Sequence, residues 1–394
     1  MTETGKVPNQ TLRFGTSYFL FFAIYGIAGP YLPIMLRKIG YTTGAVGVFL
    51  GIFEFVGIAG PLILARKADH AGRFNPSLFF SGIAVIAGLT VLVSLHNTIA
   101  TILSLALISL GLKTPVPVLD ASLLKVIETK TAQGNRAPNY GVLRALGSVG
   151  FVLVTLGVQA IPGFDESKPG RIALYIGALV IAYLVGLAWL PETGTGLRAG
   201  KKQALNFSWM DSTFLAGLCV IALGRLAMAP VGSFFSLYML ESLQWHAIGA
   251  MSALAGAVEI PMMILSWRIM RKHSPMQVIG LASLAIVARL LVYALFPSRG
   301  GVIVGQLLHS LCYGLFQPAA VAFINMKTPP AERATGMALL LGLGMGLPAF
   351  LGSAIGGLLV ETVGYRWLFA IFSVFAVSSF ALYRANRKEL VSVR

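Results

Sequence analysis

A series of long apolar runs constrains this chain more than any other feature of its sequence. Each run is close to the roughly 20 residues that a helix needs to cross a hydrocarbon core about 30 Å thick. Charged residues make up only 11% of the chain, against about 25% in soluble domains. We therefore predict an all-α integral membrane protein. Its spans are expected at residues 12–36, 44–65, 76–95, 99–126, 139–162, 171–191, 211–240, 246–267, 276–296, 301–325, 334–360 and 367–384.

The basic residues orient these twelve helices. A net charge of +16 would suggest nucleic-acid binding in a soluble protein, but here Lys and Arg gather at the ends of the apolar runs. Because basic residues concentrate in cytoplasmic loops, the pattern places both termini in the cytoplasm. We expect a multi-pass protein of the cytoplasmic (inner) membrane, with the lipid bilayer and not nucleic acid as its surroundings. The opposite side holds only Arg37, Lys38, Lys168, Arg171, Arg299 and Arg366.

The longest polar interruption, PETGTGLRAGKKQALNFSWMD, lies between the sixth and seventh spans. Its Gly, Lys and Arg content is typical of a linker. We predict a cytoplasmic linker at 191–210 between two six-helix bundles, 1–190 and 211–394. The segment IMLRKIGYTTGAVG after the first span is similar to YMLESLQWHAIG after the seventh. Such internal repetition favours a transporter with its solute site at mid-membrane between the repeats.

The connection after the second span carries Asp-x-x-Gly-Arg at Asp69, Gly72 and Arg73. This resembles the loop signature of the major facilitator superfamily, in which an aspartate caps a neighbouring helix end and a basic residue pairs with it. The family usually has a glycine four residues before the aspartate, where this chain has Ala65. The alternative is a charged turn of no special meaning, but the position between these two spans favours the signature.

Longer segments narrow the resemblance to the lactose permease and phenylpropionate permease branch of that superfamily. They are GTSYFLFFAIYGIAGPYLPIML in the first span, PVPVLDASLLKV and NYGVLRALGSVGF in the fourth and fifth, and GQLLHSLCYGLFQPAAVAFI in the tenth. The resemblance runs in order over nearly the whole chain. It implies the major facilitator fold, with twelve transmembrane helices in two bundles that rock about a central site.

Arg144 raises the question of what balances its charge, since an arginine at mid-bilayer costs roughly 2.5 to 3.5 kcal/mol. The resemblance implies that Arg144 pairs with Asp120 on the fourth span and binds the solute. A structural ion pair between the two spans is the alternative. Lys113 lies two turns before Asp120, across a bend predicted by two prolines, and either binds solute or neutralises a neighbour. Tyr25 is a candidate for stacking on a solute, although most membrane aromatics only pack.

Polar residues recur along one face of the tenth span at spacings of three, four and four: Gln306, His309, Tyr313 and Gln317. A polar stripe on a membrane-spanning helix indicates a face that borders a water-filled path. The resemblance implies that His309, with Arg289 on the ninth span, belongs to a proton-coupling network. Cys312 stands where the lactose permease has its proton-carrying glutamate, so the coupling scheme of that permease does not transfer directly.

Two carboxylates inside spans are candidates for carrying the proton instead. Glu259 in the eighth span can load and release it and can also contact solute, and Glu54 in the second span is a further candidate. For both, the alternative is a permanent pair with an arginine. Arg225 has no partner that the sequence identifies. The spans therefore contain one more cation than carboxylate, which favours an organic anion over a neutral sugar as the solute. The cations are Lys113, Arg144, Arg225 and Arg289, and the carboxylates are Glu54, Asp120 and Glu259.

We expect a secondary active transporter for a small polar or anionic organic solute, of the sugar or aromatic-acid class, that works as a monomer and a proton symporter. A sodium-coupled or facilitative carrier and a non-transporting solute sensor are the alternatives. The sequence holds no Gly-x-Ser-x-Gly, His-Glu-x-x-His or phosphate-loop motif, so we predict no enzyme, catalytic residue or cofactor. Cys219 and Cys312 indicate neither a disulfide nor a metal site. The glycines at 335–357 predict close packing of the eleventh span against the second.

Overall fold

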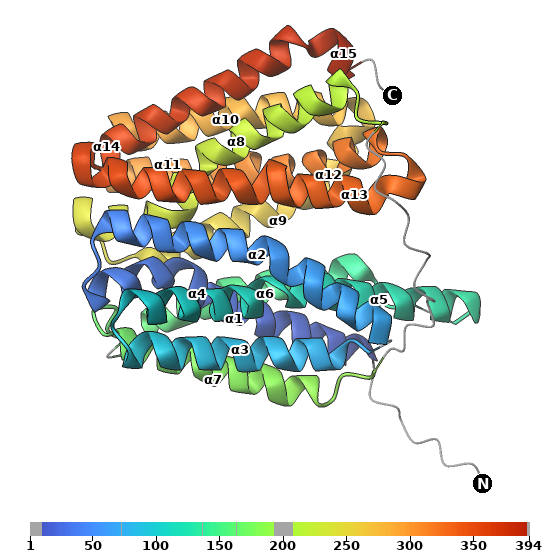
Figure 1. The fold of residues 1–394 in the computed structure, drawn as a ribbon, viewed down its shortest axis with the longest axis horizontal. Coiled ribbons are helices and arrows are strands. Elements are labelled where there is room, and N and C mark those ends of the chain that lie inside the picture. Colours follow the sequence, from blue (N-terminus) through green and yellow to red (C-terminus); the bar gives the residue numbers. More distant parts are fainter. Residues whose placement is uncertain (1–9, 72, 136, 163, 193–207, 392–394) are drawn as a thin grey trace. The chain divides into compact units, whose positions relative to one another are not determined.

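The computed structural model describes residues 10–71, 73–135, 137–162, 164–192 and 208–391, with side chains except at 61–71, 331 and 334. These residues form helices joined by short connections, with no strand among them (Figure 1). The predicted all-α class is confirmed.

The N-terminal half of the chain contains seven helical segments. Two of them, α4 and α5, make up one span of 35 residues, Thr98–Ala132. The segments are α1 (Gln10–Ile39), α2 (Thr43–Ala71), α3 (Asn75–Ser94), α4 (Thr98–Lys113), α5 (Pro115–Ala132), α6 (Tyr140–Ala160) and α7 (Pro169–Leu187).

The C-terminal half contains more segments, because short π-helical turns interrupt two of its long helices and a third extends the end of α8. They are α8 (Ser212–Leu237), η1 (Tyr238–Ser242), α9 (Ile248–Lys272), α10 (Pro275–Leu295), α11 (Arg299–His309), η2 (Ser310–Leu315), α12 (Phe316–Lys327), η3 (Pro330–Glu332), α13 (Arg333–Leu339), η4 (Leu340–Gly346), α14 (Leu347–Ala385) and α15 (Arg387–Val391).

Eleven helical stretches among the described residues are long and apolar enough to cross a membrane. The last, Thr335–Ala385, has 51 residues, enough for two spans of about 20. Its backbone leaves helical geometry at Gly364, where φ is 80° and ψ is 173°. Because a positive φ is accessible to glycine at little cost, this residue divides the stretch into the eleventh and twelfth spans.

Polar side chains and prolines set where the helices begin. Asn139 accepts a hydrogen bond from the backbone N–H of Val142 at 3.1 Å and so caps α6. Ser274 and Gln277 form a reciprocal capping box at the start of α10. Between α4 and α5, the regular helix is interrupted at Thr114, which keeps helical φ and ψ, directly before Pro115, which has no N–H to donate. The interruption falls where the sequence predicts a bend.

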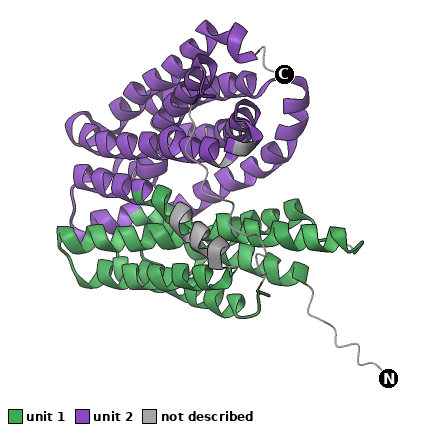
Figure 2. Cartoon of the chain, turned by 45° about the vertical axis from the view of Figure 1, so that its right-hand side comes forward, with its two compact units in different colours: residues 1–32, 56–202 green, residues 33–55, 203–394 purple. Residues whose placement is uncertain are grey.

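By its internal contacts the chain divides into two compact units (Figure 2). Unit 1 holds residues 1–32 and 56–202, and unit 2 holds residues 33–55 and 203–394. In unit 1, α3 packs against α4 and α7, and in unit 2, α8, α10 and α14 pack against one another. The end of α1 and the first part of α2 therefore belong by packing to the unit that contains the C-terminal half.

Glycines allow α2 and α14 to touch through their backbones within unit 2. A Cβ atom added to Gly47 would lie 2.5 Å from the carbonyl oxygen of Ser353 and 2.7 Å from Cα of Gly357. No side chain fits in that space, as in other close helix contacts built on small residues. The predicted close packing of the glycine-rich eleventh span against the second is confirmed.

Candidate functional site

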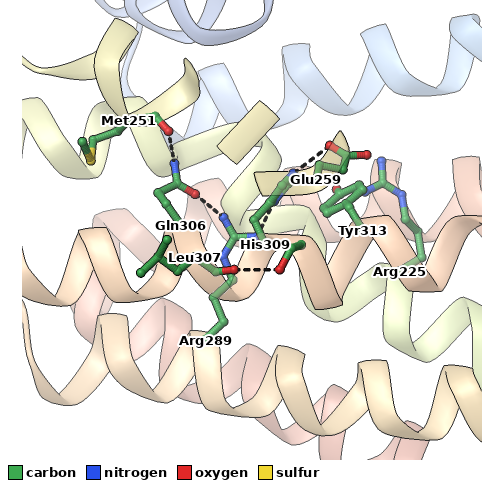
Figure 3. A network of polar contacts seen from close by, with 9 residues as sticks. Arg225, Met251, Glu259, Arg289, Gln306, Leu307, His309 and Tyr313 are labelled. Carbon is green, nitrogen blue, oxygen red and sulfur yellow. Dashed lines mark hydrogen bonds and ion pairs between the residues drawn. The ribbon is translucent and has the colours of Figure 1, made fainter. Parts of the chain in front are cut away.

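Arg289 on α10 is the centre of a hydrogen-bond network inside unit 2 (Figure 3). Only 2% of this residue is exposed. Its Nε donates to the Tyr293 hydroxyl at 3.2 Å, and its Nη2 donates to Oε1 of Gln306 at 2.6 Å. Nε2 of Gln306 donates in turn to the backbone carbonyl of Met251 on α9 at 3.1 Å. Among the described ion pairs none includes Arg289, so neutral groups solvate this buried cation.

His309, the last residue of α11, connects Arg289 to a carboxylate. Its Nδ1 lies 2.8 Å from Nη1 of Arg289, and its Nε2 lies 3.3 Å from Oε2 of Glu259 on α9. The imidazole therefore stands between a cation and an acid. The structure brings together three of the four residues predicted for proton coupling: Glu259, Arg289 and His309 (Figure 3).

A second group of polar residues continues from His309. The ring of Tyr313 in η2 stacks on the His309 ring with centroids 4.7 Å apart. Its hydroxyl accepts a hydrogen bond from Nη1 of Arg225 on α8 at 2.6 Å. Nη2 of Arg225 lies 3.8 Å from Oε2 of Glu54 on α2. The partners that the sequence does not identify for Arg225 are therefore Tyr313 and Glu54, and this contact fits the ion-pair interpretation of Glu54.

His309 and Tyr313 stack where α11 passes into the π-helical turn η2. His309 precedes η2 directly, and the hydroxyl of Ser310 donates to the backbone carbonyl of Leu307 at 2.9 Å. π-helical turns are rare and are frequent at functional sites. His309 and Tyr313 are four residues apart, so their side chains lie on one face of the helix and their rings are within reach of each other. A regular α-helix was expected here, and the sequence holds no clear signal of the π turn.

In unit 1, Asp120 and Arg144 do not form the direct ion pair that was expected, as judged from the described contacts. Asp120 on α5 accepts a hydrogen bond from the Tyr18 hydroxyl of α1 at 2.5 Å. The Arg144 guanidinium lies over the Phe22 ring, 4.4 Å from its centroid. The charges of Asp120 and Arg144 both act on the hydroxyl of Tyr140. Aspartate is one methylene shorter than glutamate, and here a tyrosine takes the place of the arginine as its partner.

Arg144 is the fifth residue of α6, so it lies roughly 6 Å along the helix from its first residue, at 1.5 Å per residue. The first turn of α6 contains no acidic residue. The positive end of a helix dipole disfavours a cation and favours an anion. The guanidinium of Arg144 is therefore placed where an added negative charge would be stabilised.

Lys113 and Tyr25 are held against neighbouring helices of unit 1. A Cβ atom added to Gly57 of α2 would lie 2.8 Å from Cγ of Lys113, so the lysine stem crosses that glycine. The hydroxyl of Tyr25 donates to the backbone carbonyl of Leu112 at 3.0 Å. Its ring packs edge-on against Phe21 with centroids 5.5 Å apart. These contacts fit the packing alternative for Tyr25.

The loop signature is described only in part, because Gly72 and the side chain of Asp69 lie outside the described structure. Nε of Arg73 lies 4.0 Å from Oε2 of Glu192. Oε1 of Glu192 accepts the backbone N–H of Phe74 at 2.6 Å, at the start of α3. Sequence reasoning missed Glu192 because it follows α7, far from the motif in the chain. It also missed Tyr18, Tyr140 and Tyr293 as partners of the charged groups.

Ionisable and polar side chains that hydrogen-bond to one another inside membrane-spanning helices are characteristic of transporters, because such groups are costly in lipid and mark solute and proton paths. Fold and site together define a multi-pass membrane transporter. The chain belongs to the MFS_1 like family, whose model matches residues 11–371, and thus to the major facilitator superfamily. The predicted family is confirmed.

Two relatives cover almost the entire chain. The maltose permease of Geobacillus stearothermophilus is 25% identical over 387 residues, which are 95% of this chain and 92% of that protein. A probable 3-phenylpropionic acid transporter of Escherichia coli (strain K12) is 24% identical over 388 residues, 93% of this chain and 96% of that protein. Both are named as transport proteins.

Solved structures share the fold. The nucleoside transporter NupG superposes with a TM-score of 0.77 at 15% identity, covering 95% of this chain and 99% of that one. A POT family transporter solved with a thioalcohol conjugated peptide gives a TM-score of 0.75 at 12% identity, covering 97% of this chain and 96% of the other. At these identities the likeness concerns the fold alone.

Proposed function

We propose that this protein is a secondary active transporter that moves a small polar or anionic organic solute across the cytoplasmic membrane by proton symport. Its two bundles, 1–190 and 211–394, alternate access to a central site, joined by the linker 191–210. Maltose and 3-phenylpropionic acid, in the names of the two relatives, mark the sugar and aromatic-acid classes as candidates. Both termini face the cytoplasm, and a single chain forms a complete path without a cofactor or metal.

The observation that carries the proposal is the connection from Arg289 through His309 to Glu259. A carboxylate that is hydrogen-bonded by a histidine, inside the membrane, can take up a proton from one side and release it to the other. The side chain of Glu259 is 29% exposed, whereas that of His309 is 16% exposed. Glu259 is therefore the more exposed end of the connection.

The state of Arg144 favours an anionic solute. Its guanidinium is in none of the described ion pairs and stacks on Phe22 near the positive end of α6. An arginine can bind a carboxylate at the edge of its guanidinium through two parallel hydrogen bonds while an aromatic ring stacks on the flat face of the guanidinium. A solute that carries both a carboxylate and a ring would therefore fit Arg144, Phe22 and Tyr18.

A sodium-coupled or facilitative carrier and a solute sensor are the alternatives. Glu54 lies 3.8 Å from the cation Arg225, and Glu259 is hydrogen-bonded by the imidazole of His309, a titratable side chain. Such a group suits a proton better than a sodium ion, which requires several oxygen ligands. Proton symport is for this reason preferred.

External pH in a lightly buffered suspension of de-energised cells tests the function. Sugars, aromatic acids and nucleosides are added in turn to cells that make the protein. We expect a rise in external pH with one solute class, absent in cells that make Arg144→Ala. Labelled solute that equilibrates across the membrane with no rise in pH would contradict proton symport, and a solute that binds but never crosses would indicate a sensor.

A further inference from the structure

The contacts of His309 determine which of its ring nitrogens carries hydrogen. A guanidinium has only N–H donors and no acceptor, so the contact from Nη1 of Arg289 at 2.8 Å requires a lone pair on Nδ1. The neutral imidazole then carries its hydrogen on Nε2. That N–H points to Oε2 of Glu259, 3.3 Å away, which accepts it.

Gln306 determines where the Arg289 guanidinium lies. It is 3% exposed, and both ends of its amide are used. Its Oε1 must accept from Nη2 of Arg289, because the guanidinium cannot accept, and its Nε2 must donate to the carbonyl of Met251. The amide therefore cannot turn over without losing both bonds. Gln306 on Nη2 and Tyr293 on Nε hold two of the three guanidinium nitrogens, and the third, Nη1, lies against Nδ1 of His309.

We propose that Gln306 is a positioning residue that sets the protonation form of His309. By holding Nη2 of Arg289, it keeps Nη1 on Nδ1 of His309 and so maintains the neutral form with hydrogen on Nε2. His309 then acts as a permanent donor to Glu259 and does not itself take up the transported proton. This assignment rests on the proposed proton symport only in naming Glu259 as the group that carries the proton.

The charges around His309 also favour the neutral form of its imidazole. A doubly protonated ring would place two donors against each other at Nδ1 and a second cation beside the buried Arg289. Glu259 alone opposes this, through an attraction at Nε2. The other ionisable groups that the described interactions connect to Arg289 or His309 are Tyr293 on α10, Cys312 and Tyr313 in η2, and, through Tyr313, Arg225 with Glu54. Of these, Glu54 is paired with Arg225 and does not contact the imidazole within the described part of the chain.

Nitrogen NMR of protein labelled with ¹⁵N-histidine, in lipid nanodiscs, tests the proposal directly. The signal of His309 is assigned by its loss in His309→Gln. We expect a bare Nδ1 and a protonated Nε2, with no change between about pH 5 and pH 8, the range in which a histidine side chain ordinarily changes its charge. An imidazolium signal for His309 in that range, or hydrogen on Nδ1, would overturn the inference.

The role of Gln306 is tested by Gln306→Leu and by Gln306→Met, which keeps the length of the side chain. Either change frees Nη2 of Arg289, so the balance between the two forms of the ring should shift by roughly five- to tenfold, the size of one net hydrogen bond. Gln317→Leu is the matched control, because Gln317 lies farther along the same span, beyond η2, and is exposed. A His309 spectrum that is the same in the wild type and in a folded Gln306 variant would refute the positioning role.

The outcomes separate this inference from the proposed function. Solute that crosses the membrane without a pH change would contradict the proposed proton symport, but the spectrum of His309 would still be as expected. An imidazolium at His309 would end the inference even where solute entry still raises external pH.

Discussion

Arg37 and Glu241 occupy corresponding positions in the two repeated segments and pair with each other. Arg37 follows Met-Leu after the first span and Glu241 follows Met-Leu in the seventh-span segment, 204 residues later. Nε of Arg37 donates to Oε1 of Glu241 at 2.7 Å, and the Tyr365 hydroxyl donates to Oε2 of the same carboxylate at 2.6 Å. One repeat thus supplies the cation and the other supplies the anion of a single cluster in unit 2.

We expect Glu241→Ala to destabilise the protein more than Arg37→Ala. Both side chains of the pair are 33% exposed, so the ion pair contributes at most about 1 kcal/mol. Loss of Glu241 also leaves the largely buried Tyr365 hydroxyl without its acceptor, which adds roughly 1 kcal/mol. Thermal unfolding of the two single variants and the double variant measures both terms. Equal effects of the two single changes would contradict the predicted role of Tyr365.

Gly47→Ala is expected to destabilise the helix contact in unit 2. The new methyl group meets backbone atoms of Ser353 and Gly357, which cannot move aside as a flexible side chain would. Overpacking of this kind typically costs about 1 to 3 kcal/mol. The control is Gly29→Ala, where an added Cβ meets nothing within 4 Å and helix propensity improves. Melting temperatures of the two variants in detergent should therefore move in opposite directions.

Glu259→Gln should abolish proton-coupled transport but leave the exchange of solute across the membrane intact. The amide cannot carry a proton, but its oxygen still accepts the Nε2 hydrogen of His309. We expect solute-driven alkalinisation and uphill accumulation to disappear, while exchange of labelled for unlabelled solute continues. Glu389→Gln on α15 is the control carboxylate outside the network. Loss of exchange together with a raised half-saturation concentration would instead assign Glu259 to solute binding.

Arg144→Lys should impair transport of an anionic solute nearly as much as Arg144→Ala. Lysine keeps the charge but loses the planar fork and the stacking on Phe22, which lies 4.4 Å from the guanidinium. We expect the half-saturation concentration to rise by roughly tenfold or more, since charge-assisted hydrogen bonds contribute about 1.5 to 3 kcal/mol. Initial uptake rates over a concentration series measure this. A lysine variant with unchanged uptake would show that charge alone suffices.

Tyr313→Phe should have a smaller effect than Tyr313→Leu. Phenylalanine keeps the ring that stacks on His309 and loses only the hydroxyl that accepts from Arg225 at 2.6 Å. Leucine loses both contacts. The comparison uses the rate of solute-driven alkalinisation in protein amounts matched by immunoblot. If the two variants are equally impaired, the bond to Arg225 and not the stack is the important contact.

Much of the site could be predicted from the sequence. The spacing of Gln306, His309 and Tyr313 indicates one polar helix face, and in the structure all three take part in one network. The neighbours on other helices could not be predicted, because contacts across 88 residues, as between Arg225 and Tyr313, depend on how each helix is rotated. The same limitation explains the expected pair of Asp120 with Arg144, since the sequence does not show that Tyr18 lies within reach of the carboxylate.

The sequence by itself determined the class, the number of spans and the charge bias of the connections. A bilayer requires a fixed length of apolar helix and disfavours basic residues on one side, so these features can be read from residue type and order alone. The tertiary structure decided which charged groups meet and which donors and acceptors are paired. A hydrogen bond depends on differences of a few tenths of an ångström and on the direction of each donor, and only the packed helices, with their π-helical turns and glycine contacts, define these.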